Sequence, residues 1–323
     1  MSRPDDLRRE HTALRATSGA HLLSRDVVRV TGPDAAGYLQ GQCSQDVGAL
    51  ADGAAAEALL LSPQGKVEVY LRVSRLGGEE YVLDTDAGFG EVMMARLQRF
   101  RLRVKVEFEP LDWVCAAIRG PDAASAVASG PELVLPVEWA GLAGFDLLGP
   151  APVGGLDDWV GGTVRCGEPA WEAARIEAGI PVNGREVMEG SIAAELGLVD
   201  RTVSFTKGCF TGQELVARLD SRGSNVARRL CGVVVDGPPS DARAGLEPVA
   251  PAVPLGAVVT TADGSHTVGS ISSVAWSPGS ASTVALATLH RRVTPPGPVV
   301  VTWEESGVAH SRPAESRPLP LVV

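Results

Sequence analysis

The chain has 323 residues, of which 45% are hydrophobic and 21% are charged, so it is long enough to bury two or three cores. This composition excludes a disordered chain. The formal net charge of −10 argues against a general nucleic-acid binder, because neutralising phosphates requires a basic surface. We therefore expect a folded, multidomain protein with no direct nucleic-acid partner.

Cysteine and histidine usage indicates the compartment and argues against a metal site. Five cysteines and five histidines are scattered without a C-x-x-C pair, which predicts neither a disulfide framework nor bound zinc. The first residues, MSRPDDLRRE, lack the apolar run of a signal peptide. No run of about 18 apolar residues suggests a membrane-spanning helix. The expectation is a cytoplasmic protein without a membrane partner.

The first half of the chain predicts alternating strands and helices. A strand at 27–31 ends at Gly-Pro-Asp, which starts a helix, and two strands follow around the turn at 62–65. A helix is expected from Gly90 to Phe100. The stretch RLRVKVEFEP then alternates basic and apolar residues, which predicts a strand with one basic face formed by Arg99, Arg101, Arg103 and Lys105. That face suits a polyanionic tail, or it is the solvated face of an edge strand.

The second half predicts a helix followed by a strand-rich end. GPDAASAVASG indicates a short helix, GFDLLGP a strand and EPAWEAARIEAG a helix, with Pro169 in its first turn and Gly179 at its stop. Segment 236–256 is rich in proline and glycine, and we expect loops around short strands there. The strands from VVTTADG to PVVVTW are spaced like a small β-barrel or sandwich.

The stretch KGCFTGQE places a cysteine directly before a predicted helix. Thr211 and Glu214 have the T-x-x-E spacing of a capping box in front of LVARL, so we expect a helix to begin at Gly212. The helix start and Lys207 both lower a thiol pKa, which favours a functional role for Cys209. The alternative is a buried structural cysteine, because free cysteines are among the most buried residues. Exposure distinguishes the two.

Trp171 and Arg175 form a second candidate site. They are four residues apart on one predicted helix, so they share a face and can stack and pair with a flat acidic heteroaromatic ligand. The alternative is a core tryptophan with an arginine that extends past it to solvent. Dinucleotide, Walker, nucleophile-elbow and HExxH signatures are absent. The residues therefore point to a binding surface and one thiol.

KGCFTGQELVARLDSRG resembles the signature of the YgfZ folate-binding family, which is related to the glycine-cleavage aminomethyltransferase, or T-protein. YLQGQCSQDV, SPQGKVEVYLRV, WEAARIEAGIPVNGRE and SPGSASTVALATLHR resemble other family segments in the same order, so the likeness covers nearly the whole chain. It implies an α+β fold of three domains in a ring around a folate-sized channel. On this chain, the implied domains are 1–55 with 150–226, then 56–149, and a C-terminal β-barrel at 227–323.

The resemblance also implies a function. It implies binding of tetrahydrofolate, or of a polyglutamylated or methylene derivative, and support of iron–sulfur protein assembly or repair. Effects on iron–sulfur tRNA-modifying enzymes would be indirect, and the partners would be iron–sulfur client or assembly proteins. Cys209 would be the important thiol, as nucleophile, transient cluster ligand or partner contact. The remaining motif residues are Lys207, Gly208, Gly212, Gln213 and Glu214.

The resemblance bears on three binding residues. Trp171 matches a folate-contacting tryptophan, and Arg175 is a candidate because it shares its helix face. Arg25 aligns with an aromatic residue that some members carry. Glu195 falls near an acid that holds the pterin in aminomethyltransferases.

The central hairpin departs from the transferases. Their hairpin carries an Asp-Asp pair, one of which is needed for methylene transfer, whereas Glu68 and Val69 stand at about those places here. Transfer needs an acid beside the reacting folate nitrogen. We therefore expect binding without aminomethyl transfer. The alternatives are a folate-dependent aminomethyltransferase or demethylase, and a redox or scaffold protein with a vestigial folate pocket.

Overall fold

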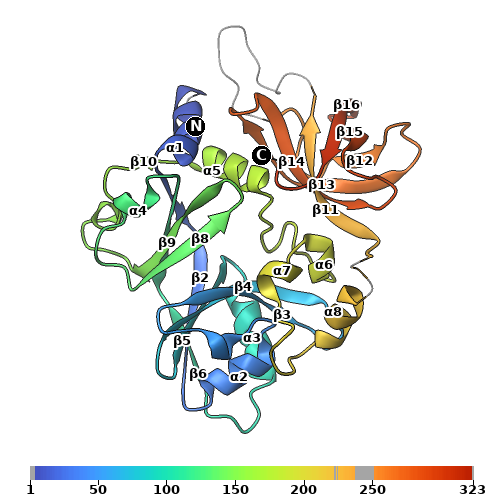
Figure 1. The fold of residues 1–323 in the computed structure, drawn as a ribbon. Coiled ribbons are helices and arrows are strands. Elements are labelled where there is room, and N and C mark those ends of the chain that lie inside the picture. Colours follow the sequence, from blue (N-terminus) through green and yellow to red (C-terminus); the bar gives the residue numbers. More distant parts are fainter. Residues whose placement is uncertain (1–3, 222, 224, 237–250, 322–323) are drawn as a thin grey trace.

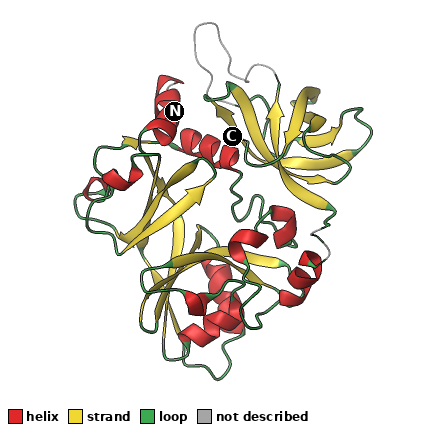
Figure 2. Ribbon diagram, in the orientation of Figure 1, coloured by secondary structure: helices red, strands yellow, loops and turns green. Residues whose placement is uncertain are grey.

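The computed structural model describes residues 4–221, 223, 225–236 and 251–321. Helices and strands are mixed through the N-terminal part of the chain, and strands dominate the C-terminal part (Figures 1 and 2). The strands form two open five-stranded sheets and one closed barrel. This arrangement confirms the predicted α+β class with a C-terminal barrel. Within the described ranges, no helix is long and apolar enough to cross a membrane.

The first sheet has the strand order β10-β1-β7-β9-β8. Its strands are β1 (Gly19–Leu23), β7 (Trp113–Arg119), β8 (Leu133–Trp139), β9 (Leu142–Pro150) and β10 (Val164–Arg165). Helix α5 (Glu168–Ala178) packs between helix α1 (Pro4–Ala16) and barrel strand β13 (Thr267–Ser277). Leu7, Leu14 and Trp171 share the core beneath the two helices.

The second sheet has the order β3-β4-β5-β2-β6. Its strands are β2 (Arg25–Thr31), β3 (Ala55–Leu61), β4 (Val67–Gly77), β5 (Glu80–Asp86) and β6 (Glu107–Leu111). Helices α2 (Ala35–Gln42) and α3 (Gly90–Arg99) supply Leu39 and Leu97 to its core, where both side chains are fully buried. Burying these apolar faces is the main stabilisation of such a layer.

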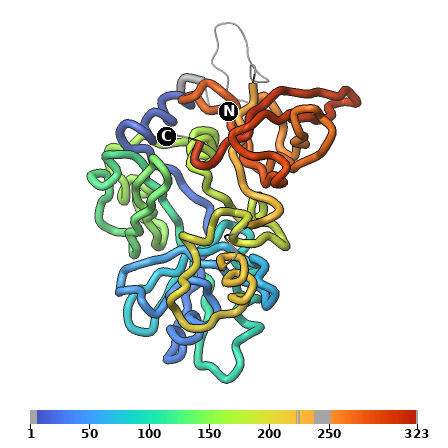
Figure 3. The backbone as a smooth tube through the Cα atoms, turned by 45° about the vertical axis from the view of Figure 1, so that its right-hand side comes forward, coloured from blue at the N-terminus to red at the C-terminus, as the bar shows by residue number. Residues whose placement is uncertain are grey.

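The barrel closes in the order β11-β14-β13-β12-β15-β16. Besides β13, its strands are β11 (Arg228–Val235), β12 (Val258–Thr261), β14 (Ser282–His290), β15 (Gly297–Glu305) and β16 (Val308–Arg317). Val233, Val259 and Val301 fill its interior and are fully buried. Closure leaves no unpaired sheet edge in the barrel. Figure 3 shows that the last described residues return toward α5, where the Leu321 amide donates to the Glu177 carbonyl at 2.8 Å.

Three short helices lie between the barrel and the second sheet (Figure 1): α6 (Ala193–Leu196), α7 (Val199–Thr202) and α8 (Gln213–Asp220). Leu196, Val203 and Val216 pack with residues of β3 and β4 in one core cluster. The remaining short elements are α4 (Ala123–Ala126), η1 (Val47–Ala49) and η2 (Leu156–Asp158).

The two open sheets share the chain in an interleaved way. Ser24 alone separates β1 from β2, and Asp112 alone separates β6 from β7, yet each pair of strands is divided between the sheets. The sheets cut across the domain ranges implied by the resemblance, since β2 of the range 1–55 pairs with β5 and β6 of the range 56–149. The domain boundaries themselves stay a prediction.

Most of the predicted elements are confirmed. Helix α5 has Pro169 in its first turn and ends at Gly179, whose φ of 73° is the left-handed conformation of a C-terminal glycine. The predicted strand over 101–106 is wrong, because β6 begins only at Glu107 and Arg103 has a φ of 58°. The predicted basic strand face therefore does not form, and Arg99 belongs to α3. Segment 237–250, where loops were expected, lies outside the described residues.

Helix α1 was missed by the sequence analysis. Leu7, His11 and Leu14 recur at helical spacing, and all three are buried against the first sheet and α5. That i, i+4, i+7 pattern was the available signal.

Candidate functional site

Three predicted ligand contacts, Arg25, Trp171 and Arg175, line one cavity between the two open sheets and the segment that follows α5. We call it the central cavity. It measures about 110 Å³, and about 640 Å³ when the space open to solvent is counted. The polar and aromatic side chains that complete its wall are Glu57, Tyr70, Arg72, Asp86, Arg119, Trp139 and Asp146.

Trp171 is both a core residue and a wall residue. It is 3% exposed, and its ring stacks on His21 with centroids 5.0 Å apart and an interplanar angle of 18°. The Trp139 ring lies 5.0 Å away, and the Arg119 guanidinium lies 5.2 Å from the Trp171 centroid. Cation–π contact and stacking fix the indole in this place. The half-buried Trp139 offers the cavity a second aromatic side chain, which the sequence analysis missed.

Arg175 is held by the protein itself. Its guanidinium donates to Glu172 at 2.7 and 2.8 Å, to the Ser273 hydroxyl at 2.6 Å and to the Ile180 carbonyl. Burial alone would lower its pKa, but the carboxylates of Glu172 and Glu186 outweigh burial and raise it. Arg175 therefore stays charged and ties α5 to the barrel and to the cavity wall.

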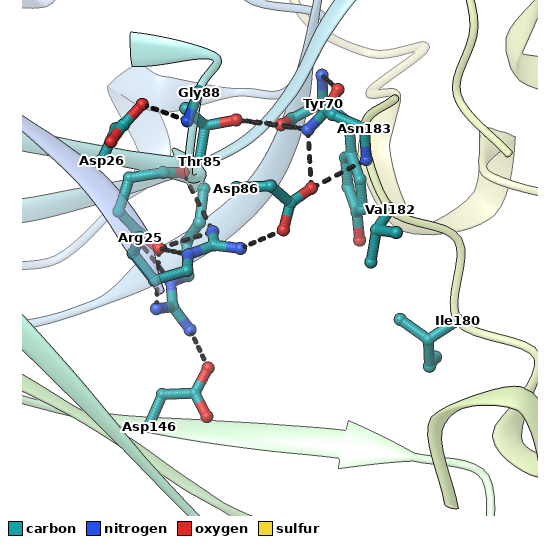
Figure 4. Close-up of polar contacts among 12 residues, drawn as sticks. Arg25, Asp26, Tyr70, Thr85, Asp86, Gly88, Asp146, Ile180, Val182 and Asn183 are labelled. Atoms are coloured by element: carbon teal, nitrogen blue, oxygen red, sulfur yellow. Dashed lines mark hydrogen bonds and ion pairs between the residues drawn. The ribbon is translucent and has the colours of Figure 1, made fainter. Parts of the chain in front are cut away.

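Beside the cavity, buried arginines and aspartates form a ladder of ion pairs in the order Arg25, Asp84, Arg72, Asp146 and Arg119. Figure 4 shows Arg25 and Asp146 from this ladder. Arg25 donates to Asp84 at 2.6 and 2.9 Å, and Arg72 donates to the same carboxylate at 2.9 and 3.0 Å. Asp146 accepts from Arg72 and from Arg119, each at 2.8 Å. Burial would raise the pKa of Asp146, but Arg119 and Arg72 outweigh it and lower that pKa to about 2.

Asp86 extends the ladder to the segment after α5. One of its oxygens accepts from Arg25 at 2.9 Å, and the other accepts from the backbone and side-chain amides of Asn183, each at 2.8 Å (Figure 4). The sequence analysis missed the ladder, although its spacing was a signal. Asp84 and Asp86 alternate on one face of β5, as Tyr70 and Arg72 do on β4.

Glu195 lies apart from these residues. It lines a separate cavity of about 290 Å³ between the 185–195 segment and the barrel. Arg185 and Arg228 line the same space. The structure thus brings Arg25, Trp171 and Arg175 together at one cavity and does not bring Glu195 to it.

Cys209 is exposed, whereas the other four cysteines are buried. Burial raises the pKa of Cys43 and of Cys166 to about 12 and that of Cys231 to about 11. The pKa of Cys115 is raised by burial as well. Since the thiolate is the reactive form, the exposure of Cys209 favours the functional interpretation over the structural one. Cys209 is not among the residues that line the central cavity.

Lys207 anchors the loop that carries Cys209. Its ammonium donates to the carbonyls of Gln40, Cys43 and Gln45 at 2.6, 2.7 and 2.8 Å. An ammonium has three donors, and all three are used here. Burial lowers the pKa of Lys207, with Cys43 and Asp46 opposing that effect. The geometry assigns the lysine to fixing the loop on the end of α2.

The predicted capping box does not form. Helix α8 begins at Gln213, close to the expected start, but Gly212 is its N-cap with a φ of 81° and no side-chain cap hydrogen bond. A Cβ at Gly212 would collide with the Ser62 carbonyl oxygen, so the close approach of the hairpin turn requires glycine. Gln213 instead accepts from the Phe210 amide at 3.1 Å. Gly208 and Glu214 are exposed.

Glu68 and Val69 of the central hairpin make their contacts outside the central cavity. The Glu68 carboxylate lies 2.6 Å from the buried Arg96 guanidinium and 3.7 Å from that of Arg99, and Val69 is fully buried in the core of the second sheet. Neither residue lines the central cavity. In the described part of the chain, no group of three or more His, Cys, Asp or Glu residues is gathered for a metal ion.

The comparisons with known proteins, by family model and by sequence, agree with one another. A family model described as the GCVT N-terminal domain matches residues 3–132. The tRNA-modifying protein YgfZ of Pectobacterium atrosepticum is 30% identical over 227 residues, which cover 64% of this chain and 68% of that protein. An uncharacterised protein of Haemophilus influenzae is 30% identical over 206 residues, covering 63% and 69%.

The transferases are more distant in sequence and similar in fold. The aminomethyltransferase of Cutibacterium acnes is 26% identical over 267 residues, covering 71% of each chain. The crystal structure of the glycine cleavage system aminomethyltransferase T from Bartonella henselae superposes with a TM-score of 0.79 and 21% identity, covering 98% of this chain and 89% of that one. At this identity the likeness shows a shared fold.

Proposed function

Because the chain belongs to the family that unites YgfZ proteins with the glycine-cleavage aminomethyltransferases, we propose that it binds tetrahydrofolate, or a polyglutamylated or methylene derivative, in the central cavity. The observation that carries the proposal is the meeting of Trp171, Trp139 and Arg25 in one cavity. Flat rings bind between aromatic side chains, and a few polar groups fix their orientation.

The residues of the cavity fit this ligand class. A pterin ring presents N–H donors and a carbonyl acceptor, which suit the carboxylates and guanidinium groups of the wall. Ligand sites commonly measure about 300–1,000 Å³. The 110 Å³ of the central cavity is smaller than that. In the proposed pose the ring therefore occupies the cavity and the glutamate tail extends out of it.

The proposed role is that of an accessory protein for iron–sulfur protein assembly or repair in the cytoplasm, with indirect effects on iron–sulfur tRNA-modifying enzymes. The name of the Pectobacterium relative, a tRNA-modifying protein, supports a link to tRNA modification. The exposed Cys209 supports a thiol that acts on, or docks with, an iron–sulfur client. Five unpaired thiols support a reducing compartment.

Aminomethyl transfer is the alternative function, and the side chains of Glu68 and Val69 in the central hairpin argue against it. Transfer needs an acid beside the folate nitrogen. Glu68 is paired with Arg96, and the neighbouring Val69 is buried. We therefore place folate binding without transfer ahead of a transferase or demethylase function.

Two experiments test the proposal. Titration with tetrahydrofolate should quench tryptophan fluorescence with a micromolar dissociation constant, about 8 kcal/mol. In cells with an iron–sulfur maintenance defect, the wild-type chain should complement, Cys209→Ser should not, and the control Cys231→Ala should. Absence of quenching at millimolar tetrahydrofolate would contradict the binding part. Full complementation by Cys209→Ser would contradict the thiol part.

A further inference from the structure

Glu57 is the least constrained carboxylate in the wall of the central cavity. Its side chain is 28% exposed, and one oxygen accepts from Arg201 at 2.5 Å. Asp146 is clamped by two arginines and its side chain is 9% exposed. Asp86 already accepts three hydrogen bonds. A carboxylate offers about four acceptor sites, so Glu57 keeps the most for a ligand.

The strand holds this carboxylate in a defined place. Glu57 lies on β3 directly opposite Arg72 of β4, and Tyr70 is two residues from that arginine on the same strand face. Burial and then the charge of Glu57 raise the pKa of Tyr70, so the phenol stays protonated beside this carboxylate. Arg201 orients Glu57, and a β-strand is a more rigid mount than a loop.

We infer that Glu57 is a specificity-determining residue of the central cavity, selecting ligands that present two adjacent N–H donors to its carboxylate. A pterin has such an edge, formed by its ring N–H and exocyclic amino group. This inference rests on the proposed binding of folate. Glu195, the other candidate acid, lines a different cavity.

The hydrogen-bonding groups on the ligand edge predict which ligand Glu57 prefers. Two parallel N–H donors match the two oxygens of a carboxylate, as in a bidentate guanidinium pair. In lumazine, a carbonyl oxygen replaces the exocyclic amino group, so an acceptor would face one carboxylate oxygen and leave that oxygen unpaired, while the ring N–H still meets the other. A glutamine at this position offers one acceptor and one donor, which suits the lumazine edge better than the pterin edge. Glu57→Gln should therefore shift the preference away from pterin.

The test compares tetrahydropterin with tetrahydrolumazine as competitors of tetrahydrofolate, followed by tryptophan fluorescence. The wild-type chain should bind tetrahydropterin about tenfold or more tighter, the scale of one hydrogen bond to a charged group. Glu57→Gln should abolish or reverse this ratio. Glu138→Gln, on the exposed side of β8, is the control for the same chemical change outside the cavity. This control should keep the wild-type preference.

The outcomes separate the two proposals. Equal binding of both compounds by the wild-type chain overturns the role of Glu57, even if the variant does not fold. An unchanged ratio in folded Glu57→Gln, or an equal change in Glu138→Gln, overturns it as well while folate binding stands. If tetrahydrofolate does not bind the wild-type chain at all, the proposed function and this inference both fail.

Discussion

Arg72 on β4 donates a 2.8 Å hydrogen bond to Asp146 on β9, so a buried ion pair joins the two open sheets. Arg72 also binds Asp84 of its own sheet, and Asp146 also binds Arg119 of its own. Asp146 thus has an arginine partner in each sheet. Loss of its carboxylate would leave the buried Arg119 without this ion pair. Breaking such a pair costs about 3–5 kcal/mol.

Asp146→Asn should therefore lower the free energy of unfolding at pH 7 by about 3–5 kcal/mol. The pH dependence has a definite sign. The folded-state pKa of Asp146, about 2, lies below the ordinary 3.8, so its stabilisation is present above about pH 4 and is lost as pH falls toward 2. The part of the unfolding free energy that is lost when Asp146 becomes protonated is about 2 kcal/mol. Urea unfolding at pH 5 and pH 2.5 measures it.

The exposed Asp112→Asn is the matched control and should leave both the stability and its acid dependence unchanged. An Asp146→Asn variant as stable as the wild type at pH 7 would show that the ladder does not hold the sheets together.

Cys209 should be the thiol that reacts in the folded chain. Iodoacetamide should modify this residue rapidly at pH 8, and the four buried thiols should react only after denaturation, because burial suppresses their thiolates. Mass spectrometry of digested protein locates the label. Slow labelling of Cys209 relative to its rate in urea would show a packed cysteine instead.

Lys207→Met should loosen the loop. Removing three hydrogen bonds to the end of α2 is expected to speed amide hydrogen exchange at 205–212 about tenfold or more, at about 1 kcal/mol for each bond. If the lysine instead activates the thiol directly, exchange stays slow and only the pH profile of Cys209 alkylation changes.

Trp171→Leu should weaken tetrahydrofolate binding by about 1–3 kcal/mol, since it removes an aromatic face from the cavity wall. It should also reduce stability, because the indole is packed on His21 and Trp139. Trp159→Leu is the matched control, since this tryptophan is equally buried but belongs to another core. It should lose stability and keep its affinity. Equal affinity in both folded variants would make Trp171 a core residue alone.

Aminomethyl transfer should be absent. Supplied with tetrahydrofolate and the other glycine-cleavage proteins, the purified chain should show no methylene transfer above background. The reason is the Glu68–Arg96 pair, which holds the hairpin acid away from the cavity. Turnover in the ordinary enzyme range, about 1–1,000 per second, would instead favour the transferase alternative.

Short sequence patterns correctly predicted the elements that interactions between neighbouring residues determine. Pro169 and Gly179 bracket α5 as their positions require, and the alternation along β4 matches a half-buried strand. The same reasoning failed over 101–106, where tertiary contacts decide the conformation. There the Lys105 amide donates to Asp34 at 2.7 Å and Arg103 takes a positive φ. Alternation alone cannot reveal such a contact.

The site was only partly predictable for a similar reason. Trp171 and Arg175 came from their spacing on one helix and Arg25 from the family resemblance, and the three meet at one cavity. The alternating spacing of charged residues on β4 and β5 was the available signal for the ladder. Its Arg72–Asp146 link arises only when β4 and β9, from separate sheets, are brought together. The capping box was wrong because Gly212, which lies against the Ser62 carbonyl, is the N-cap in place of Thr211.

The one-residue links at Ser24 and Asp112 set the order in which the two open sheets can fold during synthesis. The second sheet needs only residues 25–111, so it can close while the ribosome is still translating. Strand β1, made earlier, must wait for β7 as its antiparallel neighbour and for β10 as its parallel one. Until β7 has been made, the nascent chain therefore carries an N-terminal strand without its sheet partners, next to a sheet whose strands are all present.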